Sequence, residues 1–335
     1  MIAITHKRVE AALGYIDKKI EIFAKKIESE LADLNESAKN YKNGKSNKLP
    51  SCFCNEAGQL DKQIKFIDDI LRFEVKKIIK AKPDEIKTWS KGPLNSIGLC
   101  KAFNKKILEV FRYKDQRGNK YFKSYFKRLG IKACVYCNAQ STIIASTQTG
   151  GLNARFECDH VLNKDDYPVF SMSFYNLYPS CSTCNRIKQK DKIAFDLYVE
   201  NEVDIHPDRF LFSLDEASHS LYLAEKDQNE LVVLFKDCYD IQGEIDKKFH
   251  LTGTYMQHID IAEELIRKKK VYTPKYMDIL NEEFFKLFPD EKDFRDRLII
   301  GNYSRPEEIH KRPLSKFSQD IARQIGLLNP SEKKK

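Results

Sequence analysis

The chain has 335 residues, a length that suits about two domains. Hydrophobic residues make up 41% and charged residues 32%, so the chain can bury a core beneath a strongly charged surface. The formal net charge of +9 permits binding to a polyanion such as nucleic acid without establishing it. Uncharged apolar runs stay well short of the roughly 20 residues that span a bilayer, so we expect no membrane association and no secretory signal.

Nine cysteines are an odd number in a chain of this length. Such usage favours reduced thiols and metal ligation over a disulfide framework, and it makes the cytoplasm the expected location. Cys52 and Cys54 have no second pair nearby, and we expect them to be core or surface thiols. We expect Cys100, Cys158 and Cys238 to be small buried side chains.

Residues 4–36 carry apolar side chains at steps of three and four, which predicts one long amphipathic helix. One interpretation is a helix that docks a partner protein or a second copy of the chain. The other is a helix that packs on its own domain, and the two interpretations carry equal weight. The stripe consists of Val9, Leu13, Ile16, Ile20, Phe23, Ile27, Leu31 and Leu34.

The remaining segments suggest three regions. We expect a helical N-terminal region at 1–130, a central module at 131–195, and a C-terminal region of a β-hairpin and helices at 196–335. Within them, the patterns predict a loop at 40–51, helices at 60–82 and 98–129, turn-rich strands at 131–190, a hairpin at 221–235, helices over 243–290 and a last short helix within 313–328.

Two C-x-x-C pairs, Cys134/Cys137 and Cys181/Cys184, are separated by residues 138–180. Two thiolates three positions apart can bind one ion from a tight turn, and two such turns complete a tetrahedral zinc site. Because the protein would supply all four ligands, no water could bind. The spacing therefore predicts a structural zinc and not a catalytic one.

The segment between and just after these pairs carries the residue types that phosphodiester hydrolysis needs. A neutral imidazole at His160 can take a proton from water. Asp159 and Asn185 offer hard oxygen ligands suited to magnesium or manganese. Arg186 and Lys188 can contact phosphate oxygens from the first turn of a helix.

The spacing also predicts a geometry. Asp159 and His160 are consecutive, so at the end of a strand their side chains point to opposite sides. Asn185 directly follows the second cysteine pair, so the zinc would fix the helix that carries it. Asn176 is expected either to orient His160 or to tie down the loop by side-chain-to-backbone hydrogen bonds.

The order C-x-x-C, Asp-His, Asn-Leu-x-Pro-x-Cys-x-x-Cys-Asn-x-x-Lys resembles the HNH endonuclease family, whose fold is a ββα-metal module. The resemblance covers about 131–192. It implies that His160 is the general base, that Asp159 and Asn185 bind the catalytic ion, and that Asn176 takes the middle Asn position. Asn185 stands where the family has its final His or Asn; many relatives also have Asn there, so the absence of His bears on metal preference and not on activity.

A wider pattern resembles a bacterial HNH group that includes Septu-type and retron-linked anti-phage effectors. It consists of Leu129-Gly130, Tyr167-Pro168, His206-Pro207 and Pro313-Leu314-Ser315-Lys316. This resemblance implies a role in antiviral defence and an ATPase partner protein.

These observations predict a mixed α+β protein, with a central zinc-stabilised ββα-metal module between helical N- and C-terminal regions. The expected function is an endonuclease that cuts nucleic acid with a divalent ion, with DNA favoured over RNA. The alternative is a non-catalytic zinc module that binds nucleic acid or a partner protein. Such a module has no need for Asp159, His160 and Asn185 together.

Overall fold

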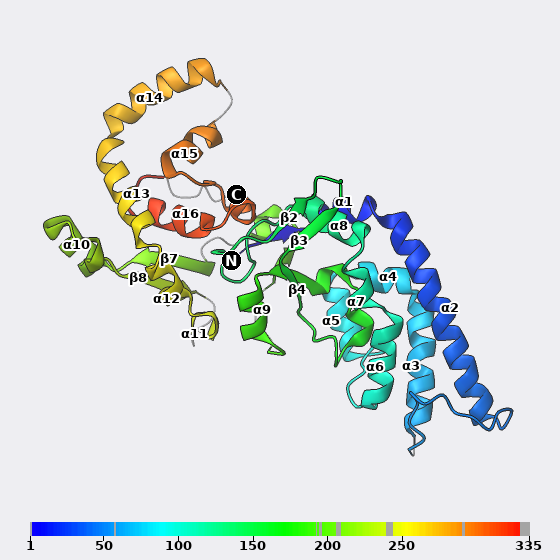
Figure 1. The fold of residues 1–335 in the computed structure, drawn as a ribbon. Helices are drawn as coiled ribbons and strands as arrows, with labels where there is room; N and C mark the ends of the chain where they lie inside the picture. Colours follow the sequence, from blue (N-terminus) through cyan, green and yellow to red (C-terminus); the bar gives the residue numbers. More distant parts are fainter. Residues whose placement is uncertain are drawn as a thin grey trace.

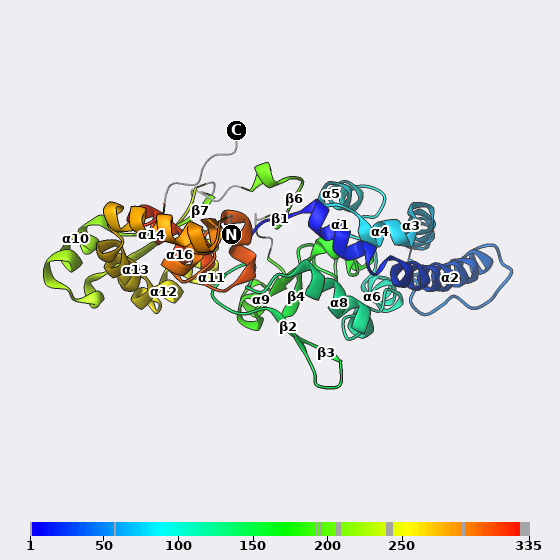
Figure 2. The same cartoon turned by 90° about the horizontal axis from the view of Figure 1, so that it is seen from above.

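The computed structural model describes residues 2–56, 58–191, 193, 196–205, 209–238, 244–289 and 292–328. N-terminal helices form one end of an elongated molecule, and C-terminal helices form the other (Figure 1). The strands β2, β3 and β4 lie between them, as the view from above also shows (Figure 2). Helices predominate and the sheets are small and two-stranded, which confirms a mixed α+β chain.

The helix predicted at 4–36 is two helices, α1 (His6–Gly14) and α2 (Asp17–Lys42), after a short strand β1 (Ile4–Thr5). The break follows Gly14, a weak helix former, and Ile16 leaves helical geometry with φ −110° and ψ 5°. From Val9 to Leu31 the apolar stripe is at most 7% exposed. It packs against the chain's own helices, so the interpretation as a free docking face is wrong.

The next two predicted helices are also divided. Segment 60–82 contains α3 and α4 with a break at Glu74, and 98–129 contains α6, α7 and α8 with a break at Arg112. Glu74 and Arg112 have positive φ values of 61° and 49°, which periodicity does not reveal. The helices of this part are α3 (Gln59–Phe73), α4 (Val75–Lys80), α5 (Pro83–Lys91), α6 (Lys101–Val110), α7 (Tyr113–Gln116) and α8 (Lys120–Leu129).

Two expectations about cysteines are wrong. Cys54 and Cys100 form a disulfide that joins the loop after α2 to the start of α6. The two cysteines are 46 positions apart in the sequence, so their spacing does not reveal the pair; the packing of α3 on α6 brings the two segments together. Cys238 is exposed, not buried.

The central region holds two antiparallel strand pairs. Strand β2 (Ile143–Ser146) pairs with β3 (Leu152–Arg155), and β4 (Glu157–His160) pairs with β5 (Leu177–Ser180). The short helix α9 (Ser182–Lys188) follows β5 directly. Two 3₁₀ turns, Pro168–Phe170 and Phe174–Asn176, connect β4 to β5, and β6 (Tyr198–Val199) pairs in parallel with β1.

The hairpin predicted at 221–235 is wrong. Residues 216–225 form a helix, α10 (Glu216–Glu225), because the Asp215 carboxylate accepts a hydrogen bond from the Ser218 N–H at 2.9 Å and caps it. Strand β8 (Val233–Asp237) pairs instead with β7 (Phe210–Leu214). Five of the helices that follow agree with the predictions: α11 (Glu244–Phe249), α12 (Leu251–Met256), α13 (Ile259–Val271), α14 (Pro274–Leu287) and α16 (Ser315–Gln324). Helix α15 (Lys292–Ile300) lies between the two predicted segments and was not expected.

The C-terminal region docks on the first cysteine pair through Asn138. The Asn138 carbonyl accepts from Leu314 N at 2.7 Å, and its side chain accepts from Lys316 N at 3.0 Å. Tyr255 donates to the Cys137 carbonyl at 2.7 Å. The segment Pro313–Lys316 therefore lies against the centre of the molecule, whereas His206 and Pro207 lie outside the described residues. Across the part of the chain that the structure describes, no helix has the length and apolar character needed to cross a bilayer.

Candidate metal and catalytic centre

The two cysteine pairs converge on one point. Cys134 and Cys137 flank a tight turn that ends at Asn138, whose φ of 53° lets its N–H reach the Cys134 carbonyl at 2.9 Å. Cys181 caps α9, and Cys184 lies in its first turn. The four sulfur atoms lie within 4.8 Å of one another, and the four residues are 0–8% exposed. This cluster can hold a metal ion, as the spacing predicted.

The surroundings of the sulfurs suit thiolate ligands. The Cys181 N–H donates to the Cys134 sulfur at 3.3 Å, and the Cys184 N–H donates to the Cys181 sulfur at 3.4 Å. Burial raises the pKa of the Cys134 thiol. Four ionised thiolates so close together would repel one another unless a cation neutralises them. The donor set therefore fits a tetrahedral zinc with no open position.

Helix α9 covers one face of β4. Side chains alternate along a strand, so Glu157 and Asp159 share the face that meets α9. Asn185 donates to the Glu157 carboxylate at 2.5 Å, and Lys188 pairs with Asp159 at 2.9 Å. The cluster cysteine Cys181 caps the same helix. The metal site and these two contacts together fix α9 on β4.

Asp159 is held from two sides. One carboxylate oxygen accepts from the Tyr136 hydroxyl at 2.5 Å, and the Lys188 ammonium contacts both oxygens at 2.9 and 3.2 Å. Burial raises the pKa of the Asp159 carboxyl, and the Lys188 charge opposes that rise. Lys188 is only 2% exposed and also donates to the His160 carbonyl at 3.2 Å. Its ammonium would have to leave Asp159 before it could contact a phosphate.

His160 points to the opposite face of β4. Its Nε2 lies 3.0 Å from the Ser171 carbonyl, and its ring contacts Tyr113 edge to face with centroids 4.5 Å apart. Burial lowers the pKa of His160 to about 3, so the imidazole is neutral at physiological pH. A carbonyl can only accept, so Nε2 carries the proton and Nδ1 keeps its lone pair. This is the protonation state that a general base requires.

Asn176 ties down the loop behind His160. Its side-chain oxygen accepts from Leu162 N at 2.7 Å, and its amide nitrogen donates to the Leu162 and Phe170 carbonyls, each at 3.1 Å. Phe170 immediately precedes Ser171, the residue that anchors the imidazole. Asn176 thus acts on His160 through the backbone and makes no direct contact with the ring.

The structure therefore divides the expected residues into two groups. Asp159, Asn185 and Lys188 lie on the α9 side of β4, and His160 with Asn176 lies on the other. Arg186 is exposed, and its guanidinium donates to the Ser182 carbonyl of its own helix at 3.4 Å.

Sequence reasoning missed several partners in this centre. Of these, only Glu157 had a readable signal, since it lies two positions before Asp159 on the same strand face. Tyr113, Tyr136 and Ser171 come from loops and helices whose approach to β4 depends on tertiary packing.

No protein-family model, no curated protein and no solved structure matches this chain.

Proposed function

We propose that this chain is a metal-dependent nuclease of the HNH type that hydrolyses phosphodiester bonds in nucleic acid, with DNA as the favoured substrate. The observation that carries the proposal is the state of His160. It is neutral, its Nε2 is fixed by the Ser171 carbonyl, and it lies beside Asp159 on a strand that a four-cysteine cluster helps to position. The order β4, β5, α9 is also the one that a ββα-metal module requires.

In this proposal His160 takes the proton from the attacking water through Nδ1. The Ser171 carbonyl holds the ring and stabilises the imidazolium that forms. Asp159 and Asn185 supply oxygen ligands for magnesium or manganese. Such an ion, when bound, neutralises charge on the phosphate and assists departure of the 3′ oxygen.

The donor set suits a cation at this place. Both carboxylate oxygens of Asp159 and the His160 carbonyl already surround a positive charge, the Lys188 ammonium. The Asn185 amide donates through its nitrogen to Glu157, so its oxygen remains available as a ligand. Binding of a divalent ion at Asp159 would require Lys188 to withdraw.

The proposal is tested by nicking of supercoiled plasmid DNA. We expect nicking with magnesium or manganese, and none without added divalent ion or in His160→Ala. A His219→Ala variant changes a histidine outside the centre and should cleave like the wild type. Equal zinc content and equal melting temperature would show that His160→Ala is folded. Undiminished nicking by folded His160→Ala would refute the assignment.

One observation favours the alternative of a non-catalytic zinc module. The ion pair between Lys188 and Asp159 satisfies the carboxylate without any divalent ion. A protein that binds nucleic acid but cleaves neither DNA nor RNA with any metal would establish this alternative. The antiviral role and the ATPase partner remain proposals that rest on the sequence resemblance. Co-purification of such a partner from the native host would support them.

A further inference from the structure

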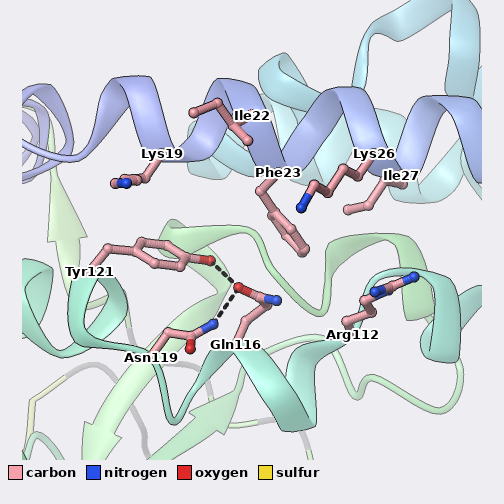
Figure 3. A pocket seen from close by; sticks show the side chains of 9 residues that line it. All are labelled: Lys19, Ile22, Phe23, Lys26, Ile27, Arg112, Gln116, Asn119 and Tyr121. Carbon is pink, nitrogen blue, oxygen red and sulfur yellow. Dashed lines mark hydrogen bonds between the residues drawn. The ribbon is translucent and has the colours of Figure 1, made fainter.

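A groove lies between α2 and the segment that joins α7 to α8 (Figure 3). Its volume is about 220 Å³. Three of its lining residues are cationic, Lys19, Lys26 and Arg112, and none of the described residues that line it is acidic. Phe23 and Tyr121 add aromatic rings to its walls. Figure 3 shows Lys26 and Phe23 pointing from α2 toward the opposite wall.

The two groove lysines of α2 differ from the paired lysines of the same helix. Lys25, Lys39 and Lys42 each form an ion pair with a carboxylate. Lys19 and Lys26 form none within the described part of the chain, and both are exposed. Their charges are therefore available to an anion from outside.

The opposite wall carries an ion-paired arginine and the start of a helix. Arg112 is held beside the groove by Glu30 at 2.9 Å. Asn119, the residue before α8, donates its side-chain amide to Gln116 and does not cap the helix. The first turn of α8 contains no acidic residue, so no carboxylate of that turn offsets the positive end of the helix dipole.

The groove lies next to the candidate catalytic centre. Gln116 lines the groove, and Tyr113, one turn earlier on α7, contacts the ring of His160. The two residues are separated by about 4.5 Å along the helix axis. A strand bound in the groove could therefore continue past α7 toward His160.

We infer that this groove binds the sugar–phosphate backbone of the nucleic-acid strand that is cut at His160, an inference that rests on the proposed function. Lys19 and Lys26 contact phosphates as point charges. Tyr121, which is partly exposed, contacts the sugars or bases. The amide oxygen of Gln116 already accepts from Asn119 and Tyr121, so these polar side chains are engaged with one another and we expect little sequence preference.

The test is a binding measurement in full-length His160→Ala protein without added divalent ion, so that cleavage does not interfere. Fluorescence anisotropy would follow a labelled 20-nucleotide single-stranded DNA, the same sequence as RNA, and the DNA duplex. The groove variant is Lys19→Gln/Lys26→Gln. The matched control is Lys18→Gln/Lys25→Gln, which removes the same charge at the same spacing from α2 but outside the groove lining.

For at least one of the three probes, we expect the groove variant to bind at least tenfold more weakly. Its slope of log Kd against log salt should fall by about 1.5 to 2, as expected for two lost phosphate contacts. The control should change Kd less than about twofold. The probe with the lowest Kd shows whether the substrate is single-stranded DNA, RNA or duplex DNA.

Two results would overturn the inference. One is an equal change in Kd in the groove variant and the control variant. The other is displacement of the labelled probe by polyglutamate as effectively as by unlabelled DNA. If only the groove variant binds more weakly and the wild type cleaves no nucleic acid, the groove is a nucleic-acid-binding site and only the nuclease proposal is refuted.

Discussion

Replacing Lys188 with methionine tests the buried network around Asp159. The ion pair is 2.9 Å long, and the two side chains are only 2% and 5% exposed. Removing Lys188 leaves a buried carboxylate that keeps hydrogen bonds from the Tyr136 hydroxyl and the His160 backbone but has no positive charge beside it. Loss of one side of such a pair costs about 3–5 kcal/mol of unfolding free energy.

The assay is urea unfolding at pH 7. With an m-value of roughly 4 kcal/mol per molar urea for a chain of this length, the midpoint should fall by about 1 M. Without the ammonium the pKa of Asp159 rises further, so the loss should shrink as the pH is lowered.

The matched control is Lys190→Met. Lys190 pairs with Asp165 at 3.1 Å, but those side chains are 63% and 52% exposed, so its loss should shift the urea midpoint far less than the loss of Lys188 does. The double variant Asp159→Asn/Lys188→Met should recover much of the stability, because no buried charge is left unpaired. Equal urea midpoints for Lys188→Met and Lys190→Met would show that the buried ion pair contributes no more to stability than the exposed one, contrary to this prediction.

Three further outcomes are expected. Cys134→Ser should lose bound zinc and most of its stability, measured by elemental analysis and thermal melting, whereas Cys238→Ser, exposed and outside the cluster, should keep both. Asn176→Ala should lose about 3 kcal/mol because three backbone groups lose their partner; an unchanged urea midpoint would contradict this. Burial lowers the pKa of His310 to about 3, so only the unfolded chain is protonated at this site between pH 6.5 and 3. The stability it contributes is complete above pH 6.5 and is lost at about 1.4 kcal/mol per pH unit as the pH falls toward 3. The unfolding free energy of His310→Gln should depend less steeply on pH than that of the wild type. Equal slopes in the two proteins would contradict a lowered pKa for His310.

Local patterns predicted the parts of the fold that depend on local geometry. The C-x-x-C spacing located the metal cluster, because two cysteines three positions apart fit one tight turn. Period-two alternation placed Asp159 and His160 on opposite faces of β4, where the structure finds different partners for each. The helical periods of 243–290 and 313–328 also agree with the structure.

Features set by tertiary contacts were not predictable from pattern. The breaks at Glu74 and Arg112 use positive φ values at residues that are not glycine. The freed N–H of Val75 is satisfied by Glu28 at 2.8 Å, a partner on another helix. The disulfide between Cys54 and Cys100 likewise depends on how distant segments pack.

The candidate centre around β4 and α9 shows the same limit. Residue types and order suggested Lys188 as a phosphate contact, but its burial depends on which side of α9 faces β4. Residues 216–225 form a helix that Asp215 caps, but their apolar side chains are also compatible with a strand. Such choices are decided by packing that a single sequence does not display.

The most direct test of the account is a crystal structure of His160→Ala protein soaked in manganese, with anomalous data at the zinc and manganese edges. We expect zinc at the four cysteines, manganese between Asp159 and Asn185, and the Lys188 ammonium withdrawn from Asp159. Manganese elsewhere, or Lys188 still paired with Asp159 at saturating manganese, would contradict it.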